Sequence, residues 1–490
     1  FWLKACVVLS FVGHGVAASV MTKVVVIYPE SAERDQCAQE SEPKGIGLNG
    51  TSGHSNVRRA RFTLTAFGSF ASMFIVVFAK DLYILSFGAS ADSVGAIVAV
   101  LSILLPVMYP LAGYLMDREP PMLSISGWGR RAPWFATHVV PLSIVMGAIF
   151  LPGLVWLPPA GSWLLDVWLG SCMLVAGWCI AVQITAYESA RAEIYPFKGE
   201  RVLVEGMSKV TGACAAIVGI GTQFVLWAIS TVPVRLVVSF LLFASVNVSL
   251  VAVPVLRDAR QPRDPARAGS IQESIDILRN APMRHAVGLR FWQTAAETAS
   301  ANFSIYYLTF VNGQTNSERA VTMATCGAIV ALLEFGVLIP FWSFVWMQAP
   351  ESPSRLGACL RRRAPPMRET CLCLQLLAAV SAPAVLRLLP GLLPGVRPWE
   401  WIAHALVLRF CFSPQSFFRV NAFCWAVDDD CHRGLGRRRE AVCAGVVRFF
   451  EDEGRSLGLV LFLGLGLAGM RTDNCEALCE AAAERAGCVG

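Results

Sequence analysis

The chain has 490 residues and a mean hydropathy of +0.54; 55% of the residues are hydrophobic and only 16% are charged. This composition excludes a water-soluble protein of this length and predicts an all-α polytopic membrane protein. The net charge of +6 does not predict binding to nucleic acid, because the arginines lie in short loops between apolar stretches.

Sixteen cysteines and six histidines raise the question of a metal centre or a catalytic site. Most cysteines lie inside apolar stretches, as Cys172 and Cys326 do, and no cysteine pairs have the spacing of a zinc site. The sequence also lacks a recognisable Ser/His/Asp constellation. We therefore expect no metal, no cofactor and no enzymatic activity.

The first 61 residues differ from the rest of the chain. Residues 1–28 are apolar but are interrupted by Lys4, His14 and Lys23, which predicts either a signal-like segment or an extra span. Residues 29–61 are polar and rich in Gly and Ser. Such a segment cannot bury a core, so we expect a disordered linker.

Eleven apolar stretches follow, each close to the ~20 residues that cross a bilayer as a helix. They lie at 62–85, 92–116, 134–156, 163–187, 206–229, 233–256, 286–311, 320–346, 370–392, 400–426 and 441–470. Residues 62–256 would form a bundle of six helices, and residues 285–470 a second bundle of which five helices are found. A twelfth span is not apparent before the polar tail, 471–490, which leaves open a truncated sequence or an incomplete protein.

Lys and Arg are concentrated in alternate connections between these stretches. The basic connections are 117–133, 189–201, 257–284, 348–368 and 428–440. Positively charged loops remain in the cytoplasm, so we expect all five, the central loop 257–284 included, to be cytoplasmic. In this central loop, Ile271, Ile275 and Leu278 recur at helical spacing and predict a short amphipathic helix along the membrane surface.

Three polar motifs lie in the predicted cytoplasmic connections. They are Gly113-Tyr-Leu-Met-Asp117 followed by Gly129-Arg130-Arg131-Ala132-Pro133, then Glu193-Ile-Tyr-Pro-Phe-Lys-Gly-Glu200-Arg201, and finally Asp429 followed by Gly436-Arg437-Arg438-Arg439-Glu440-Ala441. The Arg-Arg-Ala-Pro of the first motif recurs at residues 362–365, and Pro110 has a counterpart at Pro340. Matched positions in two halves are typical of transporters built from internal repeats.

With these motifs in this order, the chain resembles the major facilitator superfamily, and within it the branch of glycoside–pentoside–hexuronide cation symporters, which is related to plant sucrose transporters. The resemblance implies two six-helix bundles that expose a central cavity to each side of the membrane in turn. It also implies a secondary active transporter of a small polar solute, such as a sugar or glycoside. The alternatives are a lipid or amphiphile carrier of the same branch, or a truncated, non-transporting membrane protein.

The motifs also supply charged groups near the membrane edge. The predicted gating residues are Gly113, Asp117, Arg130, Arg131, Glu193, Arg201, Asp429, Arg438 and Glu440. A carboxylate facing a basic cluster can latch neighbouring helices together, because such a pair is less screened than in bulk water. We expect one latch between Asp117 and the pair Arg130 and Arg131, and a second between Glu193 and Arg201. The alternative is an ordinary basic loop.

Polar side chains inside the apolar stretches are costly unless they pair or line water, so each marks a candidate site. The cavity candidates are Lys209, Arg290, Gln293, Glu297, Gln183, Glu188, Arg409 and Arg419. Lys209 falls where the resembled branch has a basic residue that helps to bind sugar; a lysine reaching toward the membrane surface is the alternative. Arg290, Gln293 and Glu297 share one helix face, which fits a water-lined cavity and interhelical bonding equally well.

Glu334 is the candidate for coupling transport to an ion. It is a lone carboxylate among apolar residues, which favours uptake and release of a proton; a structural hydrogen bond to a neighbouring helix is the alternative. Sodium is less favoured. Symporters of the resembled branch that use sodium carry two aspartates in the second span, where this chain has Leu105 and Tyr109, and sodium needs hard oxygen ligands.

Three consecutive acids, Glu451, Asp452 and Glu453, lie in the eleventh stretch. Lipid cannot satisfy them. They must therefore meet Arg448, Arg455 or other buried arginines, or the helix must break at this point.

Overall fold

The computed structural model of the protein describes residues 54–118, 123–153, 162–195, 198–228, 231–257, 275–308, 312, 314, 316–342, 367–392, 399–433 and 439–467. These residues are almost entirely helical and contain no strand. The predictions for residues 1–53, for the repeated motif at 362–365 and for the tail at 471–490 lie outside this part of the chain.

The helices of the first half cover the six predicted stretches. They are α3 (Asn56–Thr63), α4 (Phe67–Phe87), α5 (Ala91–Asp117), α6 (Ala132–Ala148), α7 (Trp163–Ile194), α8 (Lys198–Ala228), α9 (Val232–Val248) and α10 (Val253–Arg257). Short 3₁₀ segments, η2 (Leu64–Ala66) and η4 (Ser249–Ala252), join α3 to α4 and α9 to α10, and η3 (Leu151–Gly153) follows α6.

The helices of the second half cover the remaining five stretches. They are α12 (Ala281–Tyr306), α13 (Asn316–Leu333), α16 (Met367–Leu392), α17 (Trp399–Arg433) and α18 (Glu440–Leu467). A π-helical turn, η6 (Glu334–Leu338), extends α13. The all-α membrane fold is confirmed. Within the described part of the chain, five helical segments are long and apolar enough to cross a membrane: Asp92–Asp117, Trp163–Ile194, Leu203–Thr222, Val232–Arg257 and Val321–Trp342. The total of eleven spans therefore stays a prediction.

Local sequence sets several helix ends. Gly88 follows α4 with φ of 70°, a left-handed conformation that glycine adopts without steric cost, and the next N–H, of Ala89, donates to the Tyr83 carbonyl at 3.0 Å. At the start of α6, Pro133 lies in the first turn, where its missing N–H would have no partner in any case. Gly88 thus ends α4, and Pro133 marks where the loop of the first motif gives way to α6.

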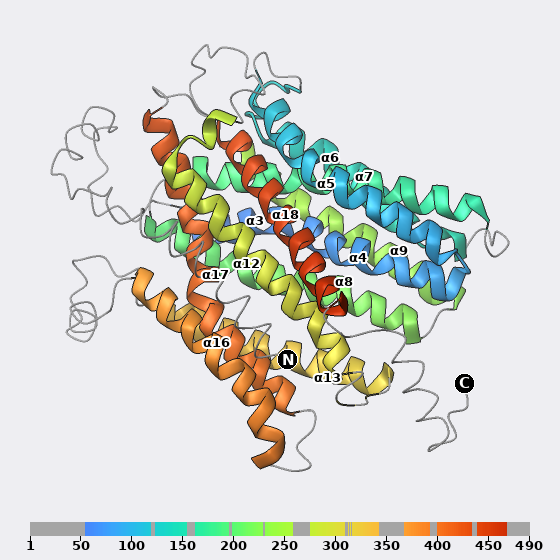
Figure 1. Cartoon of the computed structure of the whole chain (residues 1–490). Coiled ribbons are helices and arrows are strands. Elements are labelled where there is room, and N and C mark those ends of the chain that lie inside the picture. Colours follow the sequence, from blue (N-terminus) through green and yellow to red (C-terminus); the bar gives the residue numbers. More distant parts are fainter. Residues whose placement is uncertain are drawn as a thin grey trace.

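The two halves of the chain lie side by side (Figure 1). Helices α4 to α9 form one group, while α12, α13, α16 and α17 form the other. The last helix, α18, packs extensively against α12 of its own half and against α5 of the first half. It is therefore the main element through which the halves meet.

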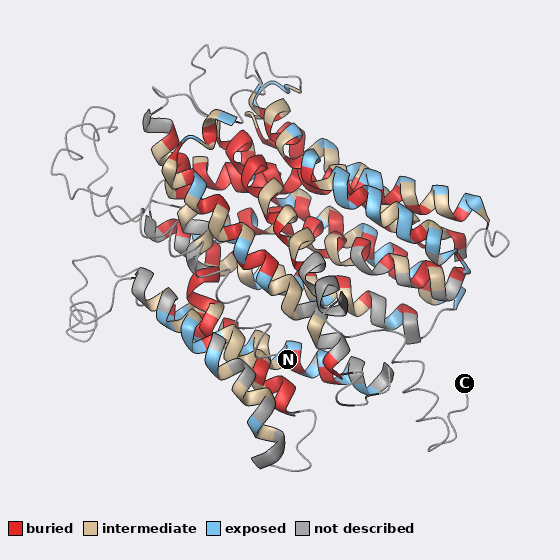
Figure 2. Ribbon diagram, viewed as in Figure 1, coloured by how far each residue is buried: buried red, intermediate tan, exposed pale blue. Residues whose placement is uncertain are grey.

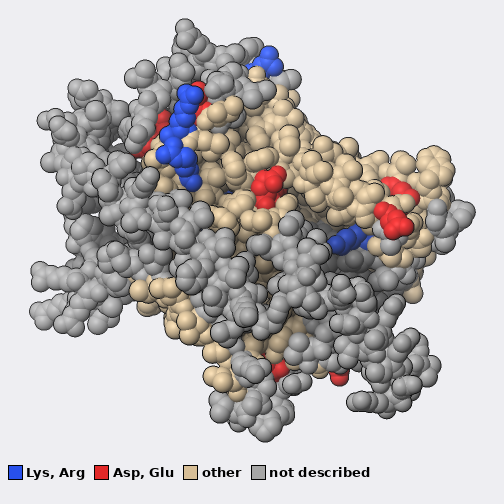
Figure 3. Space-filling view, in the orientation of Figure 1, with Lys and Arg blue, Asp and Glu red and all other residues tan. Residues whose placement is uncertain are grey.

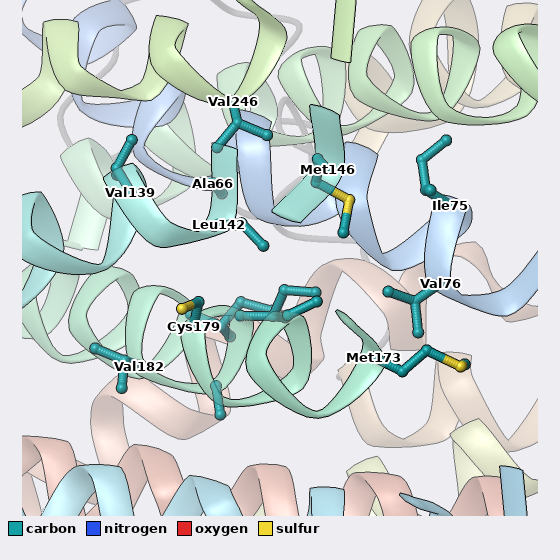
Figure 4. Close-up of a cluster of buried hydrophobic side chains, with 14 of the residues drawn as sticks. Ala66, Ile75, Val76, Val139, Leu142, Met146, Met173, Cys179, Val182 and Val246 are labelled. Atoms are coloured by element: carbon teal, nitrogen blue, oxygen red, sulfur yellow. The ribbon is translucent and has the colours of Figure 1, made fainter. Parts of the chain in front are cut away.

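Each half has its own apolar core. In the first half, side chains from α4, α6, α7 and α9, such as Ile75, Leu142, Cys179 and Val246, interdigitate (Figure 4). A separate cluster in the second half joins α12, α17 and α18 around Phe423 and Val447. Two cores agree with a division into two bundles, whose boundaries at 62–256 and 285–470 stay a prediction.

The distribution of polarity is the reverse of that in a soluble protein. Large apolar side chains such as Ile103, Ile217 and Val380 are 71–72% exposed, whereas many arginines and glutamates are buried. The face drawn in Figure 3 carries few charges among its described atoms, and Figure 2 shows exposed residues alternating with buried ones along the outer helices. Lipid would cover the apolar exterior, which leaves the protein interior as the place for charge.

The central loop differs from its expected pattern. Only residues 275–277 are helical in the described part, and they are followed by a turn. Ile277 is fully buried against the second core, while Ile275 is 52% exposed. Of the predicted apolar face, Leu278 packs partly buried against the second core and Ile275 is exposed, while Ile271 lies outside the described residues, so the amphipathic helix stays a prediction.

Candidate functional site

Charged side chains join the two halves at the end of the molecule that carries the first motif. We call Asp117, Arg130, Arg131, Glu193 and Glu440 the latch. Arg131 Nη1 lies 2.8 Å from Asp117 Oδ1, and its Nη2 lies 2.5 Å from Glu193 Oε1. Arg130 Nη2 reaches Asp117 at 3.0 Å and Glu440 Oε2 at 3.2 Å. The latch thus links α5, α7 and the loop before α6 to α18.

Asp117 also binds the start of α18 directly. Its Oδ2 accepts hydrogen bonds from the backbone N–H groups of Ala441 and Val442, both at 2.9 Å. The first N–H groups of a helix have no partner within the helix, and the helix dipole favours a negative charge at this end. A carboxylate from the first half therefore caps the last helix of the second half.

Two glycines let α5 and α18 approach closely enough for this cap. A Cβ on Gly113 would lie 2.2 Å from the Ala441 carbonyl oxygen, and one on Gly445 would lie 2.4 Å from that of Tyr109. Any larger residue would collide with backbone. Gly113, which the sequence placed among the gating residues, thus lies where α5 and α18 touch.

The latch carries three carboxylates and two guanidinium groups. Burial, together with the nearby carboxylates of Glu193 and Asp117, raises the pKa of Glu440 from 4.5 to about 7, although Arg131 and Arg130 act in the opposite direction. Burial lowers the pKa of the Arg131 guanidinium, but the three nearby carboxylates raise it by more, so the net shift is upward. Arg131 therefore stays charged while Glu440 titrates near neutral pH.

The second predicted latch, between Glu193 and Arg201, is wrong. Glu193 is held by Arg130 and Arg131, and Arg201 instead binds Asp428 on α17 through two bonds of 2.6 and 3.1 Å. Arg201 Nε also donates to the Tyr195 carbonyl at 2.6 Å. The Arg201–Asp428 pair still joins the two halves.

The third motif contributes Glu440 to the latch, and a second ion pair forms between two residues that were not singled out as gating residues. Asp430 accepts two bonds from Arg439, at 2.7 and 2.9 Å, close to Asp429. This pair tethers the end of α17 to the residue before α18. Arg438 lies outside the described residues.

Deeper in the molecule, buried charges form what we call the inner network. Glu188 on α7 accepts a hydrogen bond from Arg290 on α12 at 3.1 Å and another from Arg448 on α18 at 2.6 Å. Glu451 Oε2 lies 3.0 Å from Arg290, and its Oε1 lies 3.1 Å from Arg448. All four residues are at most 8% exposed. The inner network therefore crosses from the first half to the second.

Two of the three consecutive acids in α18, Glu451 and Asp452, meet arginines as the sequence required, while Glu453 forms no ion pair among the described residues. Glu451 also contacts Arg455 at 3.3 Å, and Asp452 forms an ion pair with Arg455. The helix continues unbroken from Glu440 to Leu467. The alternative of a broken helix at the acids is wrong.

A second cluster of polar side chains lies between α12, η6 and α17. Gln293 Nε2 donates to Glu297 at 2.9 Å and to Ser416 Oγ at 2.7 Å. Arg409 Nε donates to Glu334 Oε2 at 2.8 Å, and Arg409 Nη1 lies 3.9 Å from Glu297. Glu334 is thus not a lone carboxylate, and it opens the π-helical turn, a distortion often found at functional sites.

The remaining cavity candidates occupy two different settings. Lys209 Nζ lies 3.7 Å from a carboxylate oxygen of Glu205, one turn earlier on the same helix, α8. Gln183, in contrast, is fully buried within the first half. It accepts from Ser69 at 2.7 Å and donates to the His138 carbonyl at 3.0 Å, which joins helices of one half.

A groove of about 550 Å³ between α8 and α9 is separate from these charges. Its lining is mostly apolar, and Ile217 and Val237 within it are largely exposed. It contains no charged side chain and faces outward, so it is not part of the candidate site.

Taken together, these contacts define a helical membrane protein whose two halves meet through ion pairs at one end and in the interior. Residues 60–482 match the sequence family described as MFS/sugar transport protein. The chain belongs to this family of the major facilitator superfamily.

Two solved structures share the fold. The E. coli fucose:proton symporter FucP is 13% identical, with 84% of this chain and 91% of that chain aligned at a TM-score of 0.52. A bacterial homologue of the iron transporter ferroportin, in an outward-facing state, is 14% identical, with 86% and 94% aligned at a TM-score of 0.55. A comparison with curated protein sequences found no match. The family and the shared fold thus make the chain a transporter of the major facilitator superfamily.

Several residues of the site were not singled out from the sequence. Asp428, Asp430 and Arg439 make the pairs around the third motif, and Glu205 bonds Arg191 at 2.7 Å. Arg191 and Glu205 could have been recognised as candidates by the rule applied to the other helices, because a charged residue within an apolar helix must be paired. Their partners lie on other helices, so spacing along one helix could not reveal them.

Proposed function

We propose that the protein is a secondary active transporter that moves a sugar or related glycoside across a membrane by alternating access. The observation that carries the proposal is the inner network, in which Glu188 of the first half binds Arg290 and Arg448 of the second. Buried charge is expensive, and ion pairs that link two separately packed halves can be exchanged when the halves rock. The family description as sugar transporters and the fold shared with a fucose:proton symporter support a sugar as the solute.

We further propose that transport is coupled to protons through Glu334. Arg409 lies between Glu334 and Glu297, so a proton taken up by Glu334 would release Arg409 toward the second carboxylate. That exchange would move a charge within the second half without leaving a guanidinium unpaired. The apolar Leu105 and the phenol of Tyr109 stand where sodium-coupled relatives carry aspartates, which supports a proton over sodium.

The latch would close one side of the transport path. We assign that side to the cytoplasm because the latch lies in the basic loops. The Asp117 cap on α18 and the Arg201–Asp428 pair would hold the halves together there. Their release would open the path to the cytoplasm.

Uptake of labelled sugars into proteoliposomes tests this function. With the protein reconstituted, an inward proton gradient should drive accumulation of at least one sugar, and an equal sodium gradient should not. Glu334→Gln should abolish accumulation but preserve exchange of labelled for unlabelled sugar, and Glu453→Gln serves as the matched control. No uptake of any sugar under either gradient would contradict the proposal.

A further inference from the structure

The short helix α3, which precedes α4, is bound to the residues of the second motif. His54, just before α3, has its Nδ1 2.9 Å from Glu200 Oε1, and Arg59 Nε donates to the same oxygen at 3.2 Å. The ring of Tyr195 lies edge-on to those of His54 and Phe62, with centroids 5.5 and 5.1 Å apart. We call His54, Arg59, Tyr195 and Glu200 the clasp.

The clasp adjoins an ion pair that joins the two halves. Arg201 follows Glu200 on α8, and it binds Asp428 of α17 at 2.6 and 3.1 Å. Its Nε donates to the Tyr195 carbonyl. Tyr195, Glu200 and Arg201 are at most 4% exposed. By holding Glu200 and Tyr195 in place, the clasp therefore keeps Arg201 where it reaches the second half.

The carboxylate of Glu200 is only partly compensated. Its Oε1 takes part in both contacts, whereas its Oε2 is buried without a hydrogen-bond partner. An ionised carboxylate only accepts hydrogen bonds, so His54 must carry a hydrogen on Nδ1, and a further proton would bind at Nε2. The bond from His54 to Glu200 would then be charge-assisted, which is roughly twice as strong as a neutral bond.

The other groups around His54 oppose this protonation less than Glu200 favours it. Arg58 and Arg59 on α3 are cations, but Arg59 already binds Glu200. The segments η2 and η4, which pack against α3, contain no charged residue, and Arg257 of α10 lies over a tryptophan ring instead. Glu200 dominates because it is in direct contact and buried, where its charge is little screened. The His54 side chain is 22% exposed, so a proton from water can reach it.

We propose that His54 is a pH-sensitive brake on the opening of the cytoplasmic side. Its protonation tightens the clasp and thereby favours the state in which Arg201 and Asp428 hold the halves together. This added stabilisation is present while His54 is charged, at acidic pH, and is lost as the pH rises and the proton leaves. The inference rests on the proposed transport function and adds regulation to it. Protons that accumulate in the cytoplasm would slow the opening through which they arrive.

Hydrogen exchange in the purified full-length protein tests the clasp directly. His54→Asn keeps a neutral donor near the place of Nδ1 but cannot take up a proton. The ratio of exchange rates in α3 between this variant and the wild type cancels the intrinsic effect of pH on exchange. The two proteins should exchange alike at about pH 8, whereas the variant should exchange about 5-fold faster at about pH 5.5. A ratio that does not change with pH would overturn the inference.

Two further variants sharpen this test. His285→Asn, at the start of α12, is the matched control, because His285 forms no ion pair among the described residues; a change in α3 as large as that of His54→Asn would overturn the inference. His54→Lys supplies a charge that persists at both pH values. It should protect α3 and also the peptides that carry Arg201 and Asp428. Protection of α3 alone would show that the clasp does not act on the ion pair, and would overturn the brake.

Sugar exchange separates this inference from the proposed function. Proteoliposomes with the same pH on both sides exchange labelled for unlabelled sugar without a gradient. Relative to His54→Asn, the wild type should exchange more slowly at about pH 5.5 than at about pH 8. Protection of α3 that depends on pH and on His54, without transport of any sugar, would contradict the transport proposal alone. Sugar exchange whose pH dependence His54→Asn leaves unchanged would contradict the brake alone.

Discussion

The latch and the inner network both join the two halves, yet they differ in exposure and in charge balance. Arg130 in the latch has 31% of its side chain exposed, and the latch has one more carboxylate than it has arginines. In the inner network, two carboxylates and two arginines balance one another, and all four are buried. Water can reach and replace contacts of Arg130, although the other four latch side chains are at most 5% exposed, whereas the inner network must exchange one partner for another. The latch is therefore suited to open and close, and the inner network to hold the halves in register.

The largest effect should come from Glu188, which ties the inner network to the first half. Glu188→Gln leaves Arg290 and Arg448 to share Glu451, and breaking a buried ion pair costs about 3–5 kcal/mol. We expect a strongly reduced melting temperature and no uptake. Thermal unfolding of the purified protein measures the first effect. Glu453→Gln, which removes a neighbouring acid without an ion pair among the described residues, should change little; equal losses in both variants would contradict the account.

A smaller effect is expected at Asp117, in the latch. Asp117→Asn keeps an acceptor for the α18 N–H groups but removes the charge that Arg130 and Arg131 bind, a loss of about 1.5–3 kcal/mol per charged hydrogen bond. Turnover should fall while the amount of protein at the cell surface persists. Initial uptake rates, normalised to surface labelling, measure this. Normal turnover would remove the latch from the mechanism.

The close approach of α5 and α18 provides a third test. A Cβ at Gly113 would meet the Ala441 carbonyl oxygen at 2.2 Å, so Gly113→Ala should disfavour the latched state by about 1–3 kcal/mol. Gly95→Ala on the same helix is the matched control, because a Cβ there meets nothing within 4 Å. Protection of the latch-side loops from a protease should decrease for Gly113→Ala only. Similar protection in the two variants would show that the helices can separate without a cost.

The smallest effect concerns pH. The pKa of Glu440 is raised from 4.5 to about 7 in the latched state by burial and by Glu193 and Asp117, against Arg131 and Arg130. Glu440 therefore binds its proton more tightly in the latched state than in an open state in which it is hydrated. Protonation of Glu440 stabilises the latched state relative to the open one below about pH 4.5, and this stabilisation is lost as the pH rises to about 7. Glu440→Gln should flatten this dependence of protease protection on pH. An unchanged pH profile would mean that Glu440 does not titrate there.

The sequence predicted the helices well and their partners poorly. Length and hydropathy were sufficient to place all eleven helical stretches, because each depends on neighbouring residues only. The first latch was also predictable, since Asp117, Arg130 and Arg131 lie on either side of one loop. The partner of Arg201 was not, because Asp428 is 227 residues away and a nearer acid, Glu193, was available.

The same limit explains the interior. Glu334 was expected to be isolated because its neighbours along the chain are apolar, but Arg409 reaches it from another helix, 75 residues away. Glu188 was one of several polar residues in its helix, and its central position depends on arginines that are 102 and 260 residues away. Charge inside a helix predicts that a partner exists. Only the packing of helices determines which partner it is.

The central claim is that the two halves separate at the latch during transport. Spin labels would report this separation by pulsed electron paramagnetic resonance in a background depleted of other cysteines. One label would replace the exposed Leu203 on α8 of the first half, and the other the exposed Ile275 in the central loop, where Ile277 packs against the core of the second half. We predict a single short distance in the wild-type protein and a second, longer distance that gains population in Asp117→Asn. One distance distribution, unchanged by Asp117→Asn and by transported solute, would contradict the account.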